Sequence, residues 1–463
     1  MKLSLKICVG LILLTNACLW SQVDTNLPQP AAVDNEGNPT NNPDNNDNRM
    51  VTPPPVSGQE YPTAFAAAER SNYVTGGLAF TGAYTDNALG SITGNPVSDV
   101  SYSIAPFIGL NETTSRLHWD LNYAPGFTFY QRLSARNETD QNASVDLQYR
   151  LSPHVTLTGR DGFSKSSNVF NQPDLAGAAV VSGAVLAPNF TVIAPIADRL
   201  SNDGNVGLSY QFVANGMVGG SATFSNLQYP NQTQVPGLYD SNTQAGTTFY
   251  TLRISKMHYI GATYQYERLI TSLPQGQNET QTHAILFFYT LYATPRFSFS
   301  FFGGPQHSDT VQPPIPPSHL QLPAARSWTP AAGGSLNWQG RWSNVALSYS
   351  HIISGGGGLV GAVKLDSVSM AIRQQMARRL SGSIAGGYAQ NDVLGSPLAG
   401  TTNGHTVSGT ASLRQDFGQN FSVQLGYTRL HQDYSSVAVL ATTPNTNREF
   451  VSISYQFSRP LGR

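Results

Sequence analysis

The chain has 463 residues, of which only 11% are charged, and its 26 basic residues nearly balance its 27 acidic ones. An ordinary soluble domain carries about 25% charged residues, so this composition argues against a water-soluble protein of this length. Aromatic residues make up 10% of the chain and glycine occurs 43 times. This balance favours a protein that shows apolar side chains to lipid and small polar ones to water.

Residues 1–21 predict a secretory signal peptide, because a basic start is followed by an apolar centre at 7–14 and by small residues around Ala17 and Ser21. The mature chain is therefore expected outside the cytoplasm. No uncharged apolar run of about 18 residues follows, so the sequence excludes a helical membrane protein.

Both cysteines, Cys8 and Cys18, lie in or beside this segment. We therefore expect neither a disulfide framework nor a thiolate metal site in the mature chain. Lipidation of Cys18 stays open as an alternative, although the residues before it depart from the usual pattern, which favours Leu three positions ahead of the cysteine.

Residues 22–71 are rich in Asn, Asp and Pro and offer little to bury, which predicts a disordered periplasmic segment. Within it, residues 62–70 begin with proline and have a helix-forming composition, so one or two helical turns are expected there. The remaining residues, 72–463, are expected to form one domain.

From Tyr73 onward, segments of alternating hydrophobicity are joined by short and long links in turn. The short links are expected at residues 111–115, 152–154, 214–216, 256–258, 293–295, 339–341, 376–379 and 416–420. Outer-membrane barrels have short periplasmic turns and longer extracellular loops, so each link can be assigned to a side. Counting gives about 18 antiparallel strands with both termini periplasmic, or 16 or 20 if a pair is miscounted. A barrel of this size holds water in its lumen.

The period of two assigns the faces of these strands. The side chains expected to face lipid include Val145, Leu147, Tyr149, Leu151, Val206, Leu208, Tyr210, Phe212, Phe297, Phe299, Phe301, Phe421, Val423, Leu425 and Tyr427. The tenth strand, expected at 284–292, is apolar on both faces, so its register stays open. A soluble β-sandwich or a β-helix also alternates, but the low charge and the alternating link lengths count against both.

The last strand places Val451, Ile453, Tyr455 and Phe457 on one face and serines on the other. With the export signal and the alternating links, it resembles the terminal strand of porin-like β-barrel proteins of the Gram-negative outer membrane. The resemblance implies an all-β, transmembrane, antiparallel up-and-down barrel. It also implies that these four residues are an assembly signal, read by the barrel-assembly machinery after periplasmic chaperones deliver the chain.

Six residues, 458–463, follow the closing aromatic, where the family usually ends. Because Pro460 cannot extend a hydrogen-bonded ladder, the strand is expected to stop at about Ser458.

Charged residues on the expected lumen face are Arg116, Asp120, Asp146, Arg150, Arg160, Arg253, Glu267, Arg296, Arg373 and Arg414. An excess of arginine favours anions, and most of these arginines lie beside short links, which predicts a basic periplasmic mouth. Rim charge without selectivity is the alternative. Opposite charges on the third to fifth strands are expected to pair across the wall. A carboxylate pair for glycoside cleavage is conceivable from Asp120 and Asp146, but no motif supports it, and we expect no enzyme, cofactor or metal.

Two loops stand out. The loop at 167–203 carries apolar stretches, and by resemblance to general porins it is expected to fold into the barrel and narrow it; an extracellular cap and a contact between barrels are the alternatives. The run Gly355 to Gly358 lacks the Lys-Ser/Thr ending of a phosphate loop and is expected to be a flexible outer loop.

These observations favour a porin-like outer-membrane channel for passive diffusion of small hydrophilic solutes, limited by radius and field. A sugar-specific or polysaccharide-export barrel is the main alternative, but the inward aromatic candidates Phe107, Phe249 and Phe302 are expected on distant strands. An adhesin or scaffold is a third. The expected partners are outer-membrane lipid and the solutes, not nucleic acid, and a homo-oligomer is left open.

Overall fold

The computed structural model describes residues 72–88, 96–166, 192, 198–294, 296–313, 324–394, 403–434 and 445–461. The predicted signal peptide and the segment 22–71 lie outside these described residues. Within the described ranges, no helix is long and apolar enough to cross a membrane.

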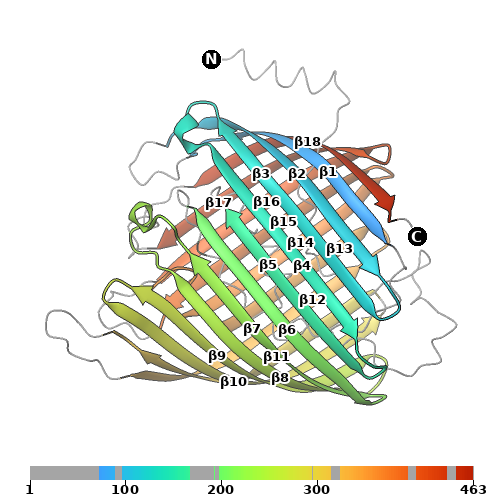
Figure 1. Ribbon diagram of the computed structural model, residues 1–463, viewed down its shortest axis with the longest axis vertical. Helices are drawn as coiled ribbons and strands as arrows, with labels where there is room; N and C mark the ends of the chain where they lie inside the picture. Colours follow the sequence, from blue (N-terminus) through green and yellow to red (C-terminus); the bar gives the residue numbers. More distant parts are fainter. Residues whose placement is uncertain are drawn as a thin grey trace.

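Eighteen antiparallel strands in the described part of the chain form one closed barrel (Figure 1). The strands are β1 (Tyr73–Thr85), β2 (Asp99–Thr113), β3 (Leu117–Tyr130), β4 (Glu138–Arg150), β5 (Val155–Ser166), β6 (Arg199–Val213), β7 (Gly216–Gln228), β8 (Ser241–Arg253), β9 (His258–Leu273), β10 (Gly276–Thr294), β11 (Phe297–Val311), β12 (Ala325–Gln339), β13 (Ser343–Ser354), β14 (Val363–Ala377), β15 (Leu380–Val393), β16 (Asn403–Phe417), β17 (Phe421–Tyr434) and β18 (Thr446–Pro460). Each strand pairs with its neighbours in the sequence, and β1 also pairs with β18, which closes the sheet. The predicted fold and strand number are confirmed.

The short links lie where the sequence predicts them and gather at one end of the barrel, beside the end of β18 (Figure 1). This end is called the short-turn end below, and the opposite one the long-loop end. One link at the long-loop end differs from expectation, because only residues 274–275 separate β9 from β10. Gly276, with φ of 144°, allows this tight turn. The tenth strand therefore begins at Gly276 and not at 284, since the polar residues before 284 continue the ladder.

The outer face of the barrel is apolar, as the alternation predicts. The exposed apolar side chains include Val206, Leu208, Tyr210, Phe212, Phe299, Phe301, Phe421, Leu425 and Tyr427. A ring of exposed apolar residues is stable only in lipid, and a closed sheet leaves no edge inside the bilayer. The barrel therefore spans a membrane.

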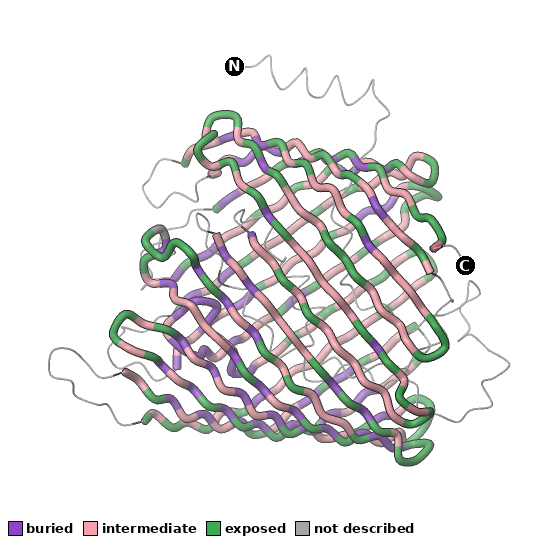
Figure 2. Tube along the Cα trace, viewed as in Figure 1, coloured by how far each residue is buried: buried purple, intermediate pink, exposed green. Residues whose placement is uncertain are grey.

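The register of β10, which the sequence left open, is settled by burial. Ile285 and Phe287 face outward with 48% and 61% exposure, whereas Leu286 and Phe288 face inward with 1% and 3%. The strand is apolar on both faces because its inner face packs against an apolar interior. Figure 2 shows buried stretches gathered at the lower left of the barrel, where β6 to β10 lie.

The seam between β1 and β18 is tightly packed. Phe457 lies opposite Gly76, and a Cβ added to Gly76 would stand 2.7 Å from the Phe457 ring. Val451, Ile453 and Tyr455 share one face, as predicted, and that face is the outer one; their recognition by the assembly machinery stays a prediction.

The final strand ends later than expected, at Pro460 and not at Ser458. Pro460 pairs with Tyr73 as the last residue of the ladder. A proline is tolerated at the end of a strand because no further pair needs its missing N–H.

Candidate functional site

The inner wall of β3 to β5 carries three charged residues side by side. Asp120 lies opposite Asp146, and Asp146 lies opposite Arg160. Nε of Arg160 is 3.6 Å from Oδ1 of Asp146, so the predicted ion pair across the wall is present, and the two side chains remain 40% and 46% exposed. Because both point into the barrel, this exposure is to the lumen. Water therefore reaches the inner wall along β3 to β5.

The two facing carboxylates, Asp120 and Asp146, interact with different partners. Asp146 has Arg160, whereas Asp120 accepts hydrogen bonds from the side-chain amides of Asn111, at 3.2 Å, and of Asn122. Amide donors relieve the repulsion between like charges that lie directly opposite on neighbouring strands. The arrangement stabilises a polar wall and keeps its charges at the surface of the lumen.

The arginines predicted to form a basic mouth lie at the short-turn end. Arg116 and Arg296 lie in short turns and are exposed. The other basic residues of this group end a strand or lie within its last five residues: Arg150, Arg253, Arg373 and Arg414.

One part of this mouth forms a pocket of about 290 Å³, lined by Ala214, Asn215, Arg253, Ile254, Ser255 and Lys256. Two of these side chains are cationic. Nη2 of Arg253 donates a 3.0 Å hydrogen bond to Oδ1 of Asn215, which fixes the guanidinium at the rim.

Glu267, the remaining predicted lumen charge, faces inward from β9 but is only 3% exposed. It lies in register with Ala245 on β8 and Thr282 on β10, neither of which carries charge. Glu267 is therefore not presented to lumen water, unlike Asp146 and Arg160. The alternation in the sequence predicts that Glu267 faces inward, but it does not indicate that other residues cover this side chain.

The wall is interrupted between β12 and β13. The ladder between these strands ends at the pair Ala332 and His351, whereas β13 stays paired with β14 up to Ser354 and Val363. Beyond His351 the end of β13, the start of β14 and the end of β15 stay paired with one another and turn into the barrel, where Ile353 and Leu394 share a buried cluster with Leu269 of β9. Residues 352–365 are called the inner flap below.

The glycine run of the inner flap lies inside the barrel, so the expectation of a flexible outer loop is wrong. Gly357, Gly358 and Gly361 have φ of 61°, 104° and 97°, which favours glycine at each position. A Cβ on Gly358 would stand 2.7 Å from the ring of Tyr229. The glycines serve tight turns and close packing, and Leu359 beside them is fully buried.

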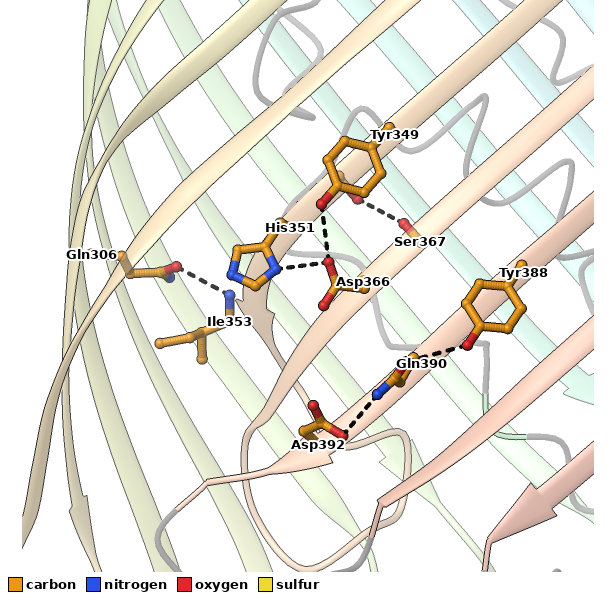
Figure 3. A network of polar contacts seen from close by, with 10 residues as sticks. Gln306, Tyr349, His351, Ile353, Asp366, Ser367, Tyr388, Gln390 and Asp392 are labelled. Atoms are coloured by element: carbon orange, nitrogen blue, oxygen red, sulfur yellow. Dashed lines mark hydrogen bonds and ion pairs between the residues drawn. The ribbon is translucent and has the colours of Figure 1, made fainter.

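Polar contacts attach the inner flap to strands on the far side of the break. The backbone N–H of Ile353 donates to Oε1 of Gln306 on β11, at 3.1 Å (Figure 3). Between β7 and β8, the Tyr229 hydroxyl donates to the carbonyl of Gly357 at 2.9 Å, and the Tyr239 N–H donates to that of Gly358 at 2.7 Å. Burial raises the pKa of the Tyr229 hydroxyl, which keeps it protonated as a donor.

An apolar cluster fills the barrel around the inner flap. Phe249, Phe288 and Phe302, from β8, β10 and β11, belong to it together with Leu359 and Val363. Two of the aromatics expected on distant strands thus share one cluster, and sequence reasoning missed Phe288, whose signal was the apolar character of both faces of β10. All three rings are at most 9% exposed, so they do not form an open aromatic slide for sugars.

Phe107, the third inward aromatic candidate, lies apart from this cluster on β2. Its ring covers Gly77 of β1, where a Cβ would stand 2.5 Å from the Phe107 Cε1 atom. The ring therefore packs at the barrel seam.

Most of the loop at 167–203 lies outside the described residues. Of residues 167–197 the structure describes only Val192, which is fully buried and belongs to the apolar cluster. Nη1 of Arg199, the first residue of β6, donates to the carbonyl of Val192 at 3.1 Å. Narrowing of the lumen by this loop stays a prediction.

No protein-family model matches the chain, and no curated protein does. Solved structures similar to it include OpdQ of Pseudomonas aeruginosa, at 10% identity over 85% of this chain and 100% of that one, with a TM-score of 0.41. The outer-membrane protein OpdK of the same organism matches at 9% identity over 83% and 99% of the two chains, with a TM-score of 0.38. The alcaligin outer-membrane receptor FauA of Bordetella pertussis matches at 10% identity over 84% and 76%, also with 0.38. These likenesses concern the barrel architecture alone. The chain is an 18-stranded barrel of the outer-membrane type.

Proposed function

We propose that this protein is an outer-membrane channel through which small hydrophilic solutes diffuse along the polar wall formed by β3 to β5. The observation that carries the proposal is the inward ion pair of Asp146 and Arg160, whose side chains keep 46% and 40% of their surface exposed inside the barrel. Charges that line a hydrated lumen act on passing solutes through their field, and their sign sets ion preference.

The unequal lining of the lumen supports this path. Cross-strand hydrogen bonds between small side chains hold the polar wall together, such as Ser164 with Asn142 at 2.7 Å, and join it to β2, where Ser103 lies 3.0 Å from Thr128. The inner flap and most of the apolar cluster lie on the side of β7 to β12. A hydrated solute avoids the apolar side, because leaving water without new hydrogen bonds is costly.

The basic mouth supports a preference for small anions. If the short-turn end is periplasmic, as the sequence predicts, its arginines attract anions at the inner opening and repel cations. The buried state of Phe249, Phe288 and Phe302 disfavours a sugar-specific channel with an aromatic slide.

Planar-bilayer recording with two opposite variants tests the channel. Arg160→Gln removes a positive charge from the polar wall and should shift the reversal potential in a salt gradient toward cations, whereas Asp146→Asn removes a negative charge and should shift it toward anions. A matched control exists on the outer face, where Nε of Arg268 lies 2.8 Å from Oε1 of Glu279. Arg268→Gln and Glu279→Gln should leave the reversal potential unchanged. A folded wild-type preparation without conductance steps would refute the proposed function.

A further inference from the structure

The break in the wall leaves one edge of β12 without a strand partner in the described part of the chain. β12 pairs with β11 from Ala325 onward, but its ladder with β13 begins only at Ala332. The segment from 325 to 331 is therefore held on one side. Pro330 lies in it and has no N–H to offer, which weakens any ladder at this point.

The inner flap contains a segment that fits this edge. Continuing the register of Ala332 with His351 would place Ala331 opposite Ile352 and Ala325 opposite Gly358. Both segments then have the same length, and the flap side is rich in glycine, which adopts extended and turned backbone conformations with little steric cost. Residues 352–358 thus match the free edge of β12 in length and register.

Identifiable contacts hold the flap in the lumen. Gln306 accepts the N–H of Ile353, a donor that would otherwise be available to an adjacent strand. The side chain of Ile353 is buried with Leu269, Ala362 and Leu394. The bonds from Tyr229 and Tyr239 to the glycine run hold the flap as well. Residues 363–365 are also paired with β15, so the flap can leave the lumen only if these contacts break and the end of β15 moves with it.

Side-chain hydrogen bonds support the position at which β13 bends into the barrel. On the last pair before the flap, Nδ1 of His351 lies 2.7 Å from Oδ1 of Asp366, and the hydroxyl of Tyr349 donates to the same oxygen at 3.1 Å (Figure 3). This network joins β13 to β14 on the outer face. The two strands are therefore held together at the hinge, and β14 is paired with β15 up to Val363 and Val393, so the ends of the three strands would move as one unit.

We propose that the inner flap, residues 352–365, is a gate that opens the lumen by swinging into the wall, where residues 352–358 complete the ladder with Ala325 to Ala331 of β12. This inference rests on the proposed function, since it names what regulates the solute path. Two packings of one hairpin, each with its own partners, form the bistable element that a switch requires. In the present structure the gate is in the lumen.

Disulfide trapping in the full-length chain tests both positions. Thr329→Cys with Ser354→Cys places two inward thiols on directly opposite residues only when the flap is in the wall. Leu269→Cys with Ile353→Cys joins two residues that share a cluster when the flap is in the lumen. Both native cysteines lie within residues 1–21, and the single-cysteine variants control for them.

The pair Thr329→Cys and Ser354→Cys, called the wall pair, should form a disulfide under mild oxidation. The oxidised channel should then show a larger single-channel conductance, which falls on reduction. The pair Leu269→Cys and Ile353→Cys should hold the channel at its low conductance when oxidised. If the wall pair does not cross-link in a folded, conducting barrel, the gate is refuted; this result is expected if another segment permanently covers the β12 edge. A cross-link that leaves the conductance unchanged would also refute the gate.

A variant that weakens the attachment of the flap inside the lumen provides an independent test of its movement. Gln306→Ala removes one hydrogen bond and should raise the rate of cross-linking of the wall pair about fivefold. Gln424→Ala, which removes an inward, buried glutamine on β17, should not. Cross-linking is read on a gel and needs no conductance, so it still tests the movement of the flap if no variant conducts and the proposed function fails. An equal cross-linking rate in the two glutamine variants would refute the role of Gln306 in holding the flap in the lumen.

Discussion

Gly77 lies at the seam where β1 meets β18, and Gly77→Ala tests how tightly the barrel closes. A Cβ at this position would stand 2.3 Å from the backbone oxygen of Tyr455 and 2.5 Å from Cε1 of the Phe107 ring. The ring can rotate aside, but the backbone oxygen belongs to the ladder itself. The strands must therefore separate locally.

Overpacking of this kind costs about 1–3 kcal/mol. Gly82 offers a matched control on the same strand, since a Cβ there would have its nearest neighbours at 4.0 Å. Gly82→Ala should be neutral or stabilise the barrel by about 0.4–1 kcal/mol, because alanine restricts the unfolded chain. The two variants should thus differ by about 1–4 kcal/mol, the sum of both effects.

Urea unfolding in lipid vesicles, followed by tryptophan fluorescence and by the gel shift of the folded barrel, measures this difference. Phe107→Ala combined with Gly77→Ala should recover only part of the loss, since the clash with the Tyr455 oxygen remains. Equal unfolding midpoints for Gly77→Ala and Gly82→Ala would refute the account of the seam.

Three further predictions follow from the lumen. Neutralising the mouth with Arg373→Gln and Arg414→Gln should shift the reversal potential toward cations without lowering stability; an unchanged potential would assign these charges to the rim alone. Phe288→Ala should cost about 3–5 kcal/mol in urea unfolding, and clearly more than the lipid-facing Phe287→Ala; equal losses would contradict the apolar cluster. Gly358→Ala, at a φ of 104° and against the Tyr229 ring, should cost about 1–3 kcal/mol and expose residues 352–365 to thermolysin, whereas unchanged protection would argue against a strained turn.

The strand number and the outer face could be predicted because both are set by local patterns. Alternation places Val206 and Leu208 on one face whatever the rest of the chain does, and both are exposed. The inward direction of Asp146 and Arg160 follows from the same rule. Their exposure to the lumen does not, because it depends on which other segments enter the barrel.

The inner flap could not be predicted, because long-range partners decide its position. Ile352 and Ile353 continue the pattern of an ordinary strand, and the following glycines are compatible with an outer loop. What turns them inward lies elsewhere: Pro330 on β12 weakens the edge that would hold them, and Gln306 on β11 accepts the N–H of Ile353. Neither position is distinguished in the sequence.

The uneven lining of the lumen follows from the break between β12 and β13. A hairpin that leaves the wall must satisfy its backbone and bury its apolar side chains elsewhere. Gln306, Tyr229 and Tyr239 meet the first requirement, and the apolar cluster that includes Phe288 and Phe302 meets the second. The β3 to β5 wall carries its own ion pair, and there charges remain open to water. The inner flap thus determines both the free width of the lumen and the side on which a polar solute can pass, so a change in its position would alter the two properties together.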